Sequence, residues 1–379
     1  MKKTVLPVLL SVGILFGTFF PAMAAGEKTA SLSLKEAITH ALANSPSVST
    51  AEKKIERDAV ALEEAEYNMR QEIKNQKKPY YYSTIQNLPI RKGYYAETAK
   101  RNLEMSKINL EQTKKKIAYD VTSAYYTLKN AQQSYQIAAE AYQLASENHR
   151  KTQLRMEVGM ATGTDVLTAE NYMQSSKYGM NKAERTANLA LLKFCNATYY
   201  DAAGSYQLTD DLEVSDFTPP DLQAGIASGL KSRTELIAVQ NKKDLDALYF
   251  ECVSALYQSN TFMYRKADLQ AQESALSVTD TENSIRLGIT KDYYDMLSSY
   301  ENIAVQKGQQ ELTKKQYRDT LAKEEVGMAT AAEVTDSLNK SAQAELSYAQ
   351  SVLTFRMAEL KYNSDIEYGL NSASLMGVY

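Results

Sequence analysis

The chain has 379 residues, of which 44% are hydrophobic and 23% charged, and its formal net charge is −3. A slightly acidic chain lacks the basic surface that nucleic-acid binding requires, so we exclude nucleic acid as a partner. The two histidines, His40 and His149, are not accompanied by cysteines or clustered carboxylates at ligand spacing. The sequence therefore predicts neither a metal site nor a bound cofactor.

Residues 1–25 have the order of a secretory signal peptide. Lys2 and Lys3 precede an uncharged apolar run that ends at Phe20, and a small-residue segment ending at Ala25 follows. We predict cleavage after Ala24 or Ala25 and export from the cytoplasm. An uncleaved anchor is the alternative, and the short run with small residues at its end disfavours it. No later apolar run reaches the roughly 18 residues that a spanning helix needs.

The first repeat is predicted over residues 26–200. Ser33 and Glu36 form a capping box that starts a helix. This helix is expected to be interrupted at Pro46 and then to continue toward Lys74. A Pro- and Tyr-bearing stretch covers residues 77–93. We interpret the basic run 74–78 as solvated surface, with contact to acidic lipid headgroups or wall polymer as the alternative.

A long helix is expected from about Gly93 to Val158. Its apolar positions alternate in steps of four and three, the pattern of a coiled-coil seam. Such a helix would be on the order of 100 Å long, too long for a compact bundle of short helices. A return helix should run from Val166 to about Asn196. The seam residues are Ile117, Val121, Ala124, Leu128, Ala131, Tyr135, Ala138, Tyr142 and Ala145.

A linker is predicted over residues 201–220 and a second repeat over 221–379. Neither Gly nor Pro occurs between Gly229 and Gly288, so a long arm should run unbroken from about Arg233 to a turn at Gly327. The return helix is expected from Glu333 to about Asp365. Cys195 and Cys252 lie in different repeats, and two separate buried thiols are favoured over a disulfide.

The two repeats share an internal sequence similarity. The segment Val158-Gly-Met-Ala-Thr-Gly-Thr-Asp165 returns in the second half as Val326-Gly-Met-Ala-Thr-Ala-Ala-Glu333. A duplicated unit of this length predicts an elongated, pseudo-symmetric body made of two long helical hairpins.

Four ordered features resemble the TolC family of outer-membrane efflux channels over nearly all of the mature chain. They are the opening segment 32–46, the junction Leu88-Pro-Ile-Arg-Lys-Gly93, the motif Ala124-Tyr-Tyr126 and the tandem Val-Gly-Met tips. The resemblance implies an all-α fold of two tandem coiled-coil hairpins. It further implies a homotrimer whose twelve-helix tunnel crosses the periplasm and docks with a periplasmic adaptor (membrane fusion protein) joined to an inner-membrane pump.

The resemblance assigns adaptor contact to the two tips. Gly supplies a left-handed turn, while Val and Met give an exposed apolar knob for a helical partner. The alternative is that these residues only close the turn, with the apolar pair folded back onto its own helices. The tip residues are Val158, Gly159, Met160, Val326, Gly327 and Met328.

Three acidic residues follow the tips. Asp165, Glu333 and Asp336 lie in the first turns of the return helices, where carboxylates stabilise a helix N-terminus; Thr164 or Asp165 is the expected cap of the first. The resemblance adds that matching carboxylates ring the narrow periplasmic entrance, where they favour cations. No Arg or Lys occurs between Ala329 and Asp336, so a gate locked by salt bridges would require Lys323.

The chain departs from the family in its strands. Family members insert two membrane strands into each half, but the first half offers only Tyr80–Leu88, between two prolines. The second half is shorter, because Pro46 to Tyr125 spans 79 positions and Thr234 to Tyr293 only 59. The sequence predicts β-barrel strands that are vestigial or absent.

The favoured function is a passive exit duct of a tripartite efflux or type I secretion system in the outer membrane or periplasm. The alternative is a non-conducting exported coiled-coil scaffold or spacer of the cell envelope. No phosphate-binding loop, nucleophile–base arrangement or catalytic carboxylate pair occurs, and the sequence predicts no enzyme activity.

Overall fold

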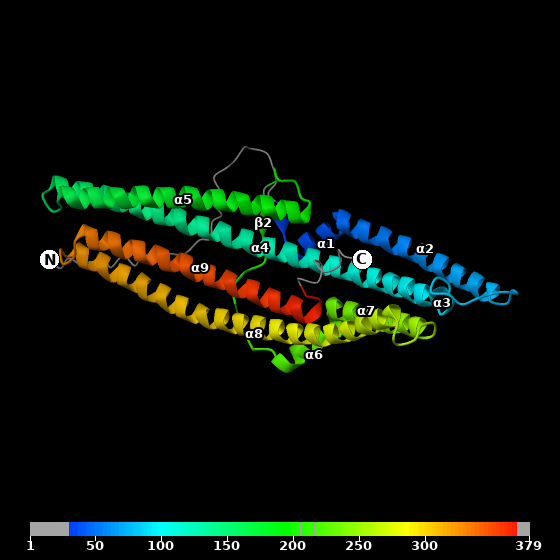
Figure 1. Ribbon diagram of the computed structural model, residues 1–379. Coiled ribbons are helices and arrows are strands. Elements are labelled where there is room, and N and C mark those ends of the chain that lie inside the picture. Colours follow the sequence, from blue (N-terminus) through cyan, green and yellow to red (C-terminus); the bar gives the residue numbers. More distant parts are fainter. Residues whose placement is uncertain (1–29, 205, 215–216, 370–379) are drawn as a thin grey trace.

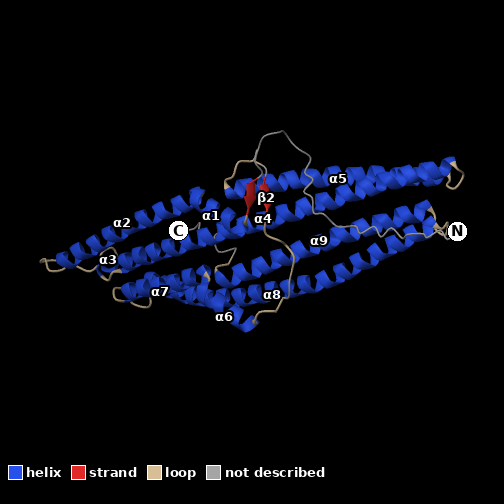
Figure 2. Ribbon diagram, turned by 180° about the vertical axis from the view of Figure 1, so that it is seen from behind, coloured by secondary structure: helices blue, strands red, loops and turns tan. Residues whose placement is uncertain are grey.

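The computed structural model describes residues 30–204, 206–214 and 217–369. The predicted signal peptide, residues 1–25, lies outside these residues. The described chain forms an elongated body of long helices with two short strands near its middle (Figures 1 and 2).

The helices of the first repeat follow the predicted order. Ser33 and Glu36 form the expected capping box, and Pro46 occupies the first turn of the second helix. The long helix and its return helix are the hairpin that the sequence predicts. The elements are α1 (Leu34–Asn44), α2 (Pro46–Asn75), α3 (Leu88–Arg91), α4 (Tyr94–Glu157) and α5 (Gly163–Thr198). Of the candidate strand Tyr80–Leu88, residues 80–87 form an irregular loop and Leu88 begins α3.

The second repeat differs from the prediction in one place. The expected unbroken arm is wrong, because the chain reverses over residues 255–261 without Gly or Pro. Thr261 supports the reversal, since its hydroxyl donates to the Gln258 carbonyl at 2.7 Å and accepts from the Tyr264 amide at 3.4 Å. A Ser or Thr side chain can satisfy backbone groups at a turn and at the start of a helix, so a reversal can form without Gly or Pro. The elements are α6 (Leu222–Ser232), α7 (Thr234–Ser254), α8 (Phe262–Glu325) and α9 (Ala331–Glu367).

The structure locates the length difference between the repeats. Helices α4 and α8 have the same length, 64 residues each, and both end directly before a repeated tip. By contrast, α2 has 30 residues and α7 has 21, and the connection 76–93 is replaced by the shorter turn 255–261. These two shortenings account for the smaller second half that the sequence shows.

Two long helices organise the body (Figure 1). Helix α4 packs against α5 over one half of its length and against α2 over the other, while α8 packs against α9 and then α7. Contacts of α4 with α9 and α7 join the two repeats, so α5 and α2 form one edge of the body and α8 the other. With about 1.5 Å of rise per residue, each 64-residue helix is roughly 96 Å long.

Each repeat has its own core, placed where a short helix covers the long hairpin. In the first, Val121, Tyr125 and Leu128 of α4 meet Phe194 of α5 and Ala37 of α1. The second core is built from equivalent positions of α8 and α9, including Ile285, Ile289, Phe355 and Tyr362. Five seam residues predicted from the sequence are buried in α4: Val121, Leu128, Ala131, Ala138 and Ala145.

The linker holds a strand that the sequence did not predict. β1 (Ala30–Leu32) and β2 (Tyr206–Leu208) pair in parallel beside α4 (Figure 2). The buried Tyr125 hydroxyl donates to the Leu32 carbonyl at 3.1 Å and accepts from the Asp210 amide at 3.0 Å. Burial raises the pKa of Tyr125 to about 12, so this anchor stays protonated over the physiological range.

Cys195 of α5 and Cys252 of α7 are both buried free thiols, as favoured from the sequence. Among the described helices, none combines the length and the apolar character needed to cross a membrane.

Candidate functional site: the hairpin tips

The two repeated turns lie at the same end of the body (Figure 1). One joins α4 to α5 and the other joins α8 to α9. Turns that are far apart in the sequence therefore become neighbours, and any partner that approaches this end meets both tips together.

Each tip ends its helix in a Schellman motif. Gly159 has φ of 77°; its amide donates to the Met156 carbonyl at 3.0 Å, and the Met160 amide donates to the Arg155 carbonyl at 2.8 Å. Gly327 has φ of 76° and the second tip repeats both hydrogen bonds, at 3.0 and 2.8 Å. A left-handed residue at this position satisfies the last carbonyls of the helix, and Gly adopts it without steric cost.

The apolar residues beside each glycine point into solvent. The exposed fractions are 70% for Val158, 74% for Met160, 70% for Val326 and 78% for Met328. The alternative in which they fold back onto their own helices is therefore wrong for the isolated chain. Exposed apolar side chains on a rigid turn are hydrated unfavourably until a partner covers them, so they favour binding.

The acids that follow the turns serve first as helix caps. The Asp165 carboxylate accepts from the Thr162 amide at 2.8 Å, and the Thr162 hydroxyl accepts from the Asp165 amide at 3.2 Å. Glu333 and Thr330 form the same box, at 2.7 and 3.2 Å. The caps are thus Thr162 and Thr330, and the expectation that Thr164 or Asp165 caps the first return helix is corrected.

These hydrogen bonds also set the charge of the acids. The backbone amide and hydroxyl of Thr162 lower the pKa of Asp165, and those of Thr330 lower the pKa of Glu333. The charge of Lys323 lowers the pKa of Glu333 further. Both carboxylates are consequently ionised at neutral pH and add negative charge beside the apolar tips.

Asp336 lies one turn further along α9. Its carboxylate has a cationic partner, which was not predicted from the sequence. Its carboxylate forms an exposed ion pair with Lys340 at 2.6 Å. A basic residue four positions on therefore screens part of its charge.

An ion pair that sequence reasoning missed connects the two tips. The Arg155 guanidinium lies 2.5 Å from the Glu324 carboxylate, whose side chain is only 7% exposed. Further from the tips along α4, the buried Asn148 amide donates to the Thr335 hydroxyl of α9 at 2.8 Å. The repeat offered a signal, because Glu324 stands where the first copy has Met156.

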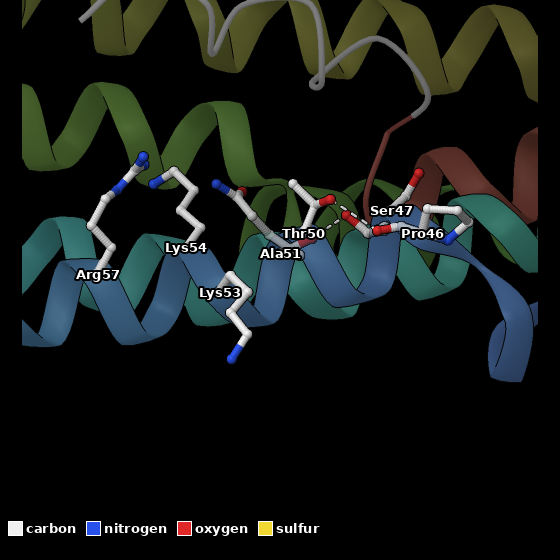
Figure 3. A pocket seen from close by; sticks show the side chains of 9 residues that line it. Pro46, Ser47, Thr50, Ala51, Lys53, Lys54 and Arg57 are labelled. Carbon is white, nitrogen blue, oxygen red and sulfur yellow. Dashed lines mark hydrogen bonds between the residues drawn. The ribbon is translucent and has the colours of Figure 1, made fainter.

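Two hollows lie away from the tips. The first, of about 680 Å³, lies between α2 and α4; Figure 3 shows Lys54 and Arg57 on one side of α2 and Lys53 on the other. Lys53 and Lys54 are paired with Glu56 and Asp58 at 2.9 and 2.8 Å. Since its cations are already paired with carboxylates of α2, this hollow gives no basis for a ligand.

The second hollow, of about 440 Å³, lies between α4, α8 and α9. Every residue lining it is uncharged, and most are Ser, Thr, Asn or Gln. No set of His, Cys, Asp and Glu in the described part of the chain is arranged to hold a metal ion.

Comparison with known proteins was made at the levels of sequence and structure. No protein-family model matches the sequence, and the search of curated proteins gave no match. Solved structures do match. The CmeC outer membrane channel of Campylobacter jejuni has a TM-score of 0.71 at 12% identity, over 90% of this chain and 88% of that chain.

Two further structures agree. The outer membrane protein VceC of Vibrio cholerae has a TM-score of 0.67 at 12% identity, over 89% of this chain and 97% of that chain. The open state of the MtrE outer membrane channel of Neisseria gonorrhoeae has a TM-score of 0.65 at 13% identity, over 89% of this chain and 90% of that chain. The TM-scores and coverage establish the fold, and identities this low establish the fold alone. The chain therefore has the TolC-like helical-hairpin fold of these outer-membrane channels, as its motifs predicted.

Proposed function

We propose that this chain is the passive exit duct of an efflux or type I secretion assembly in the cell envelope. One observation carries the proposal: two copies of the same apolar turn lie at one end of a body with a channel fold. In the proposed mechanism cargo passes through a tunnel formed by several copies, and a partner pump supplies the energy.

The tips suit a helical partner in the periplasm. Val158 and Met160 project from one rigid turn, and Val326 and Met328 from the next. An adaptor protein with a helical hairpin could place apolar side chains against both knobs, and the flexible Met side chains would adapt to it. The adaptor would in turn connect the duct to an inner-membrane pump.

Exposed apolar side chains along both edges of the body support lateral assembly. On α8, six of them recur at spacings of seven or eleven residues, which correspond to two or three helical turns. On α5, Leu167, Tyr178 and Leu189 recur every eleven residues. The α8 residues are Leu269, Leu276, Leu287, Tyr294, Val305 and Leu312.

These two edges differ from each other, so contact between them would be heterologous, and such a contact closes into a ring when the rotation between copies completes a full turn. We propose that three copies close the ring, each contributing two hairpins, which is the number that the TolC resemblance implies. Residues 26–200 and 221–379 would then be two equivalent units of each copy.

The acids near the tips would line the entrance of this ring. Three copies of Asp165, Glu333 and Asp336 would give a negative entrance that favours cations over anions. Export through the predicted signal peptide would place the duct in the periplasm and at the outer membrane.

The proposal is tested by deleting the gene in its host and measuring retention of exported dyes or toxic compounds. Complementation with the wild type should restore export. The variant Val158→Asp/Met160→Asp/Val326→Asp/Met328→Asp should assemble normally by light scattering and fail to restore it. Leu144→Asp, which adds a carboxylate at another exposed position of α4, is the control. Normal export by the deletion strain would instead favour the non-conducting scaffold.

A further inference from the structure

The end of the body opposite the tips carries a surface that the proposed duct does not use. It consists of residues 73–93, between α2 and α4, and residues 255–266, at the turn from α7 into α8 (Figure 1). We call these two segments the distal cap. Lys92 of the first segment forms an ion pair of 2.5 Å with Glu251 of α7, the helix that leads into the second segment, and the rings of Tyr94 and Tyr249 lie 5.4 Å apart beside it.

The distal cap is strongly basic in a chain whose net charge is −3. Residues 73–93 contain five Lys or Arg and residues 255–266 contain two, without an acidic residue in either segment. Arg91 and Lys92 are engaged with neighbouring side chains. Five others are exposed and form no ion pair with any described residue: Lys74, Lys77, Lys78, Arg265 and Lys266.

Large aromatic side chains project among these cations. Tyr80 is 89% exposed, Tyr82 is 74% exposed and Phe262 is 80% exposed. Tyr80 also has φ of 66°, a left-handed conformation that is strained for a residue other than glycine. A chain that holds an exposed ring in a strained conformation points to a use for that ring.

The loop is built to keep these rings outward. Between Tyr80 and Tyr82, the ring of Tyr81 turns inward and lies 5.8 Å from the Arg91 guanidinium carbon. The Asn87 amide donates to the Tyr82 carbonyl at 2.8 Å, and its oxygen accepts from the Thr84 amide at 2.8 Å.

The end of the loop is fixed as well. Leu88 and Pro89 are buried, which anchors the loop at the start of α3. The backbone of the loop that carries the two outer rings is therefore held by the folded structure before any partner binds.

We propose that the distal cap docks on the surface of a membrane that contains anionic phospholipids. A Tyr side chain settles at the headgroup level, where its ring is buried and its hydroxyl stays hydrated, and a Phe ring is buried at the boundary between headgroups and acyl chains. Lys and Arg are attracted to an anionic surface, each by a free energy of about 1 kcal/mol or a factor of about five in affinity. Docked in this way, the body points its tips away from that membrane.

Vesicle flotation of residues 26–379, which contain every described element, tests the proposal. We expect flotation with vesicles that mix phosphatidylcholine with anionic phosphatidylglycerol, little with phosphatidylcholine alone, and release at high salt. Lys77→Gln/Lys78→Gln should weaken binding by about 25-fold at low salt, the product of two five-fold factors. Tyr80→Ser/Tyr82→Ser should weaken it at every salt concentration.

Matched controls separate this surface from charge and apolarity in general. Lys307→Gln/Lys315→Gln removes two exposed lysines from the tip-proximal half of α8, and Tyr199→Ser removes an exposed ring directly after α5; both should float like the wild type. If circular dichroism shows that a loop variant is unfolded, Phe262→Ser, outside the loop, replaces it.

Equal flotation on neutral vesicles, or equal losses in the control variants, would overturn the proposal. Tight binding to soluble polyphosphate without any binding to vesicles would also overturn it and would assign the cap to an anionic polymer. None of these readouts depends on cargo transport, so the test is independent of the proposed duct.

Discussion

The guanidinium of Arg155, in the last turn of α4, lies 2.5 Å from the carboxylate of Glu324, in the last turn of α8. This ion pair bridges the two repeats immediately before their turns. It fixes the relative position of the tips, because each residue belongs to a different hairpin. A carboxylate near a helix C-terminus opposes the helix dipole, so Glu324 depends on its partner.

Removal of the cation should therefore loosen the tips. Arg155→Gln leaves a buried carboxylate without a counter-charge, and we expect local destabilisation of about 1–2 kcal/mol. This is below the ~3–5 kcal/mol of a fully buried pair, since Arg155 is partly exposed. Hydrogen exchange of residues 150–165 and 318–333 measures the effect. Arg155→Gln/Glu324→Met, which restores the Met of the first copy, should recover part of the protection.

Lys340→Gln is the control for this prediction. It breaks the exposed Lys340–Asp336 pair and should change the free energy of local opening, measured by hydrogen exchange, by less than about 0.5 kcal/mol. Equal protection in Arg155→Gln and wild type would show that the two hairpins do not depend on this pair.

Substitution of glycine by alanine should have opposite signs at two positions. Gly159 has φ of 77°, so Gly159→Ala introduces backbone strain of about 1 kcal/mol although nothing lies within 4 Å of the added carbon. Gly179, inside α5, also has open space around it, and Gly179→Ala should stabilise the helix by about 1 kcal/mol. The unfolding temperature of each variant tests this prediction. If both substitutions shifted it in the same direction, the left-handed turn at Gly159 would be contradicted.

Acidification should weaken the caps of the return helices. The folded pKa values of Asp165 and Glu333 lie below their ordinary values of 3.8 and 4.5. The capping interaction therefore stabilises the fold above those ordinary values and is lost as pH falls through the lower, folded values. Hydrogen-exchange protection factors at the start of α5 and α9, taken relative to the intrinsic exchange rate at each pH, should fall in this acid range.

Thr162→Ala removes the cap of α5 and provides the comparison. We expect it to destabilise the start of α5 by about 1 kcal/mol at neutral pH and to reduce the acid-dependent loss there. An unchanged pH profile in this variant would mean that other carboxylates govern the acid response of the tip.

The two cysteines should be unreactive while the chain is folded. Burial raises the pKa values of both Cys195 and Cys252, which lowers the fraction of nucleophilic thiolate. A thiol reagent at pH 8 should label neither residue in the native protein and both after unfolding. Fast labelling of the native form would contradict their burial, and absence of labelling in the unfolded form would reveal a disulfide.

The sequence by itself determined the regular parts of this protein. The spacing of the apolar seam residues from Ile117 to Ala145 predicted a long helix, since apolar side chains must recur on one face of a helix to be buried. The repeated Val-Gly-Met segments identified two turns, and the motifs in order identified the fold. These signals are local, so they can be read without knowing which segments meet.

Only the tertiary structure decided the features that depend on residues far apart in the chain. It brought Arg155 to Glu324 and paired residues 30–32 with 206–208, contacts that no local pattern encodes. It also reversed the chain at residues 255–261, where hydrogen bonds of Thr261 replace Gly and Pro. Helix propensity is a weak local preference, and packing of α7 against α8 overrides it because burial contributes more free energy than a continued helix.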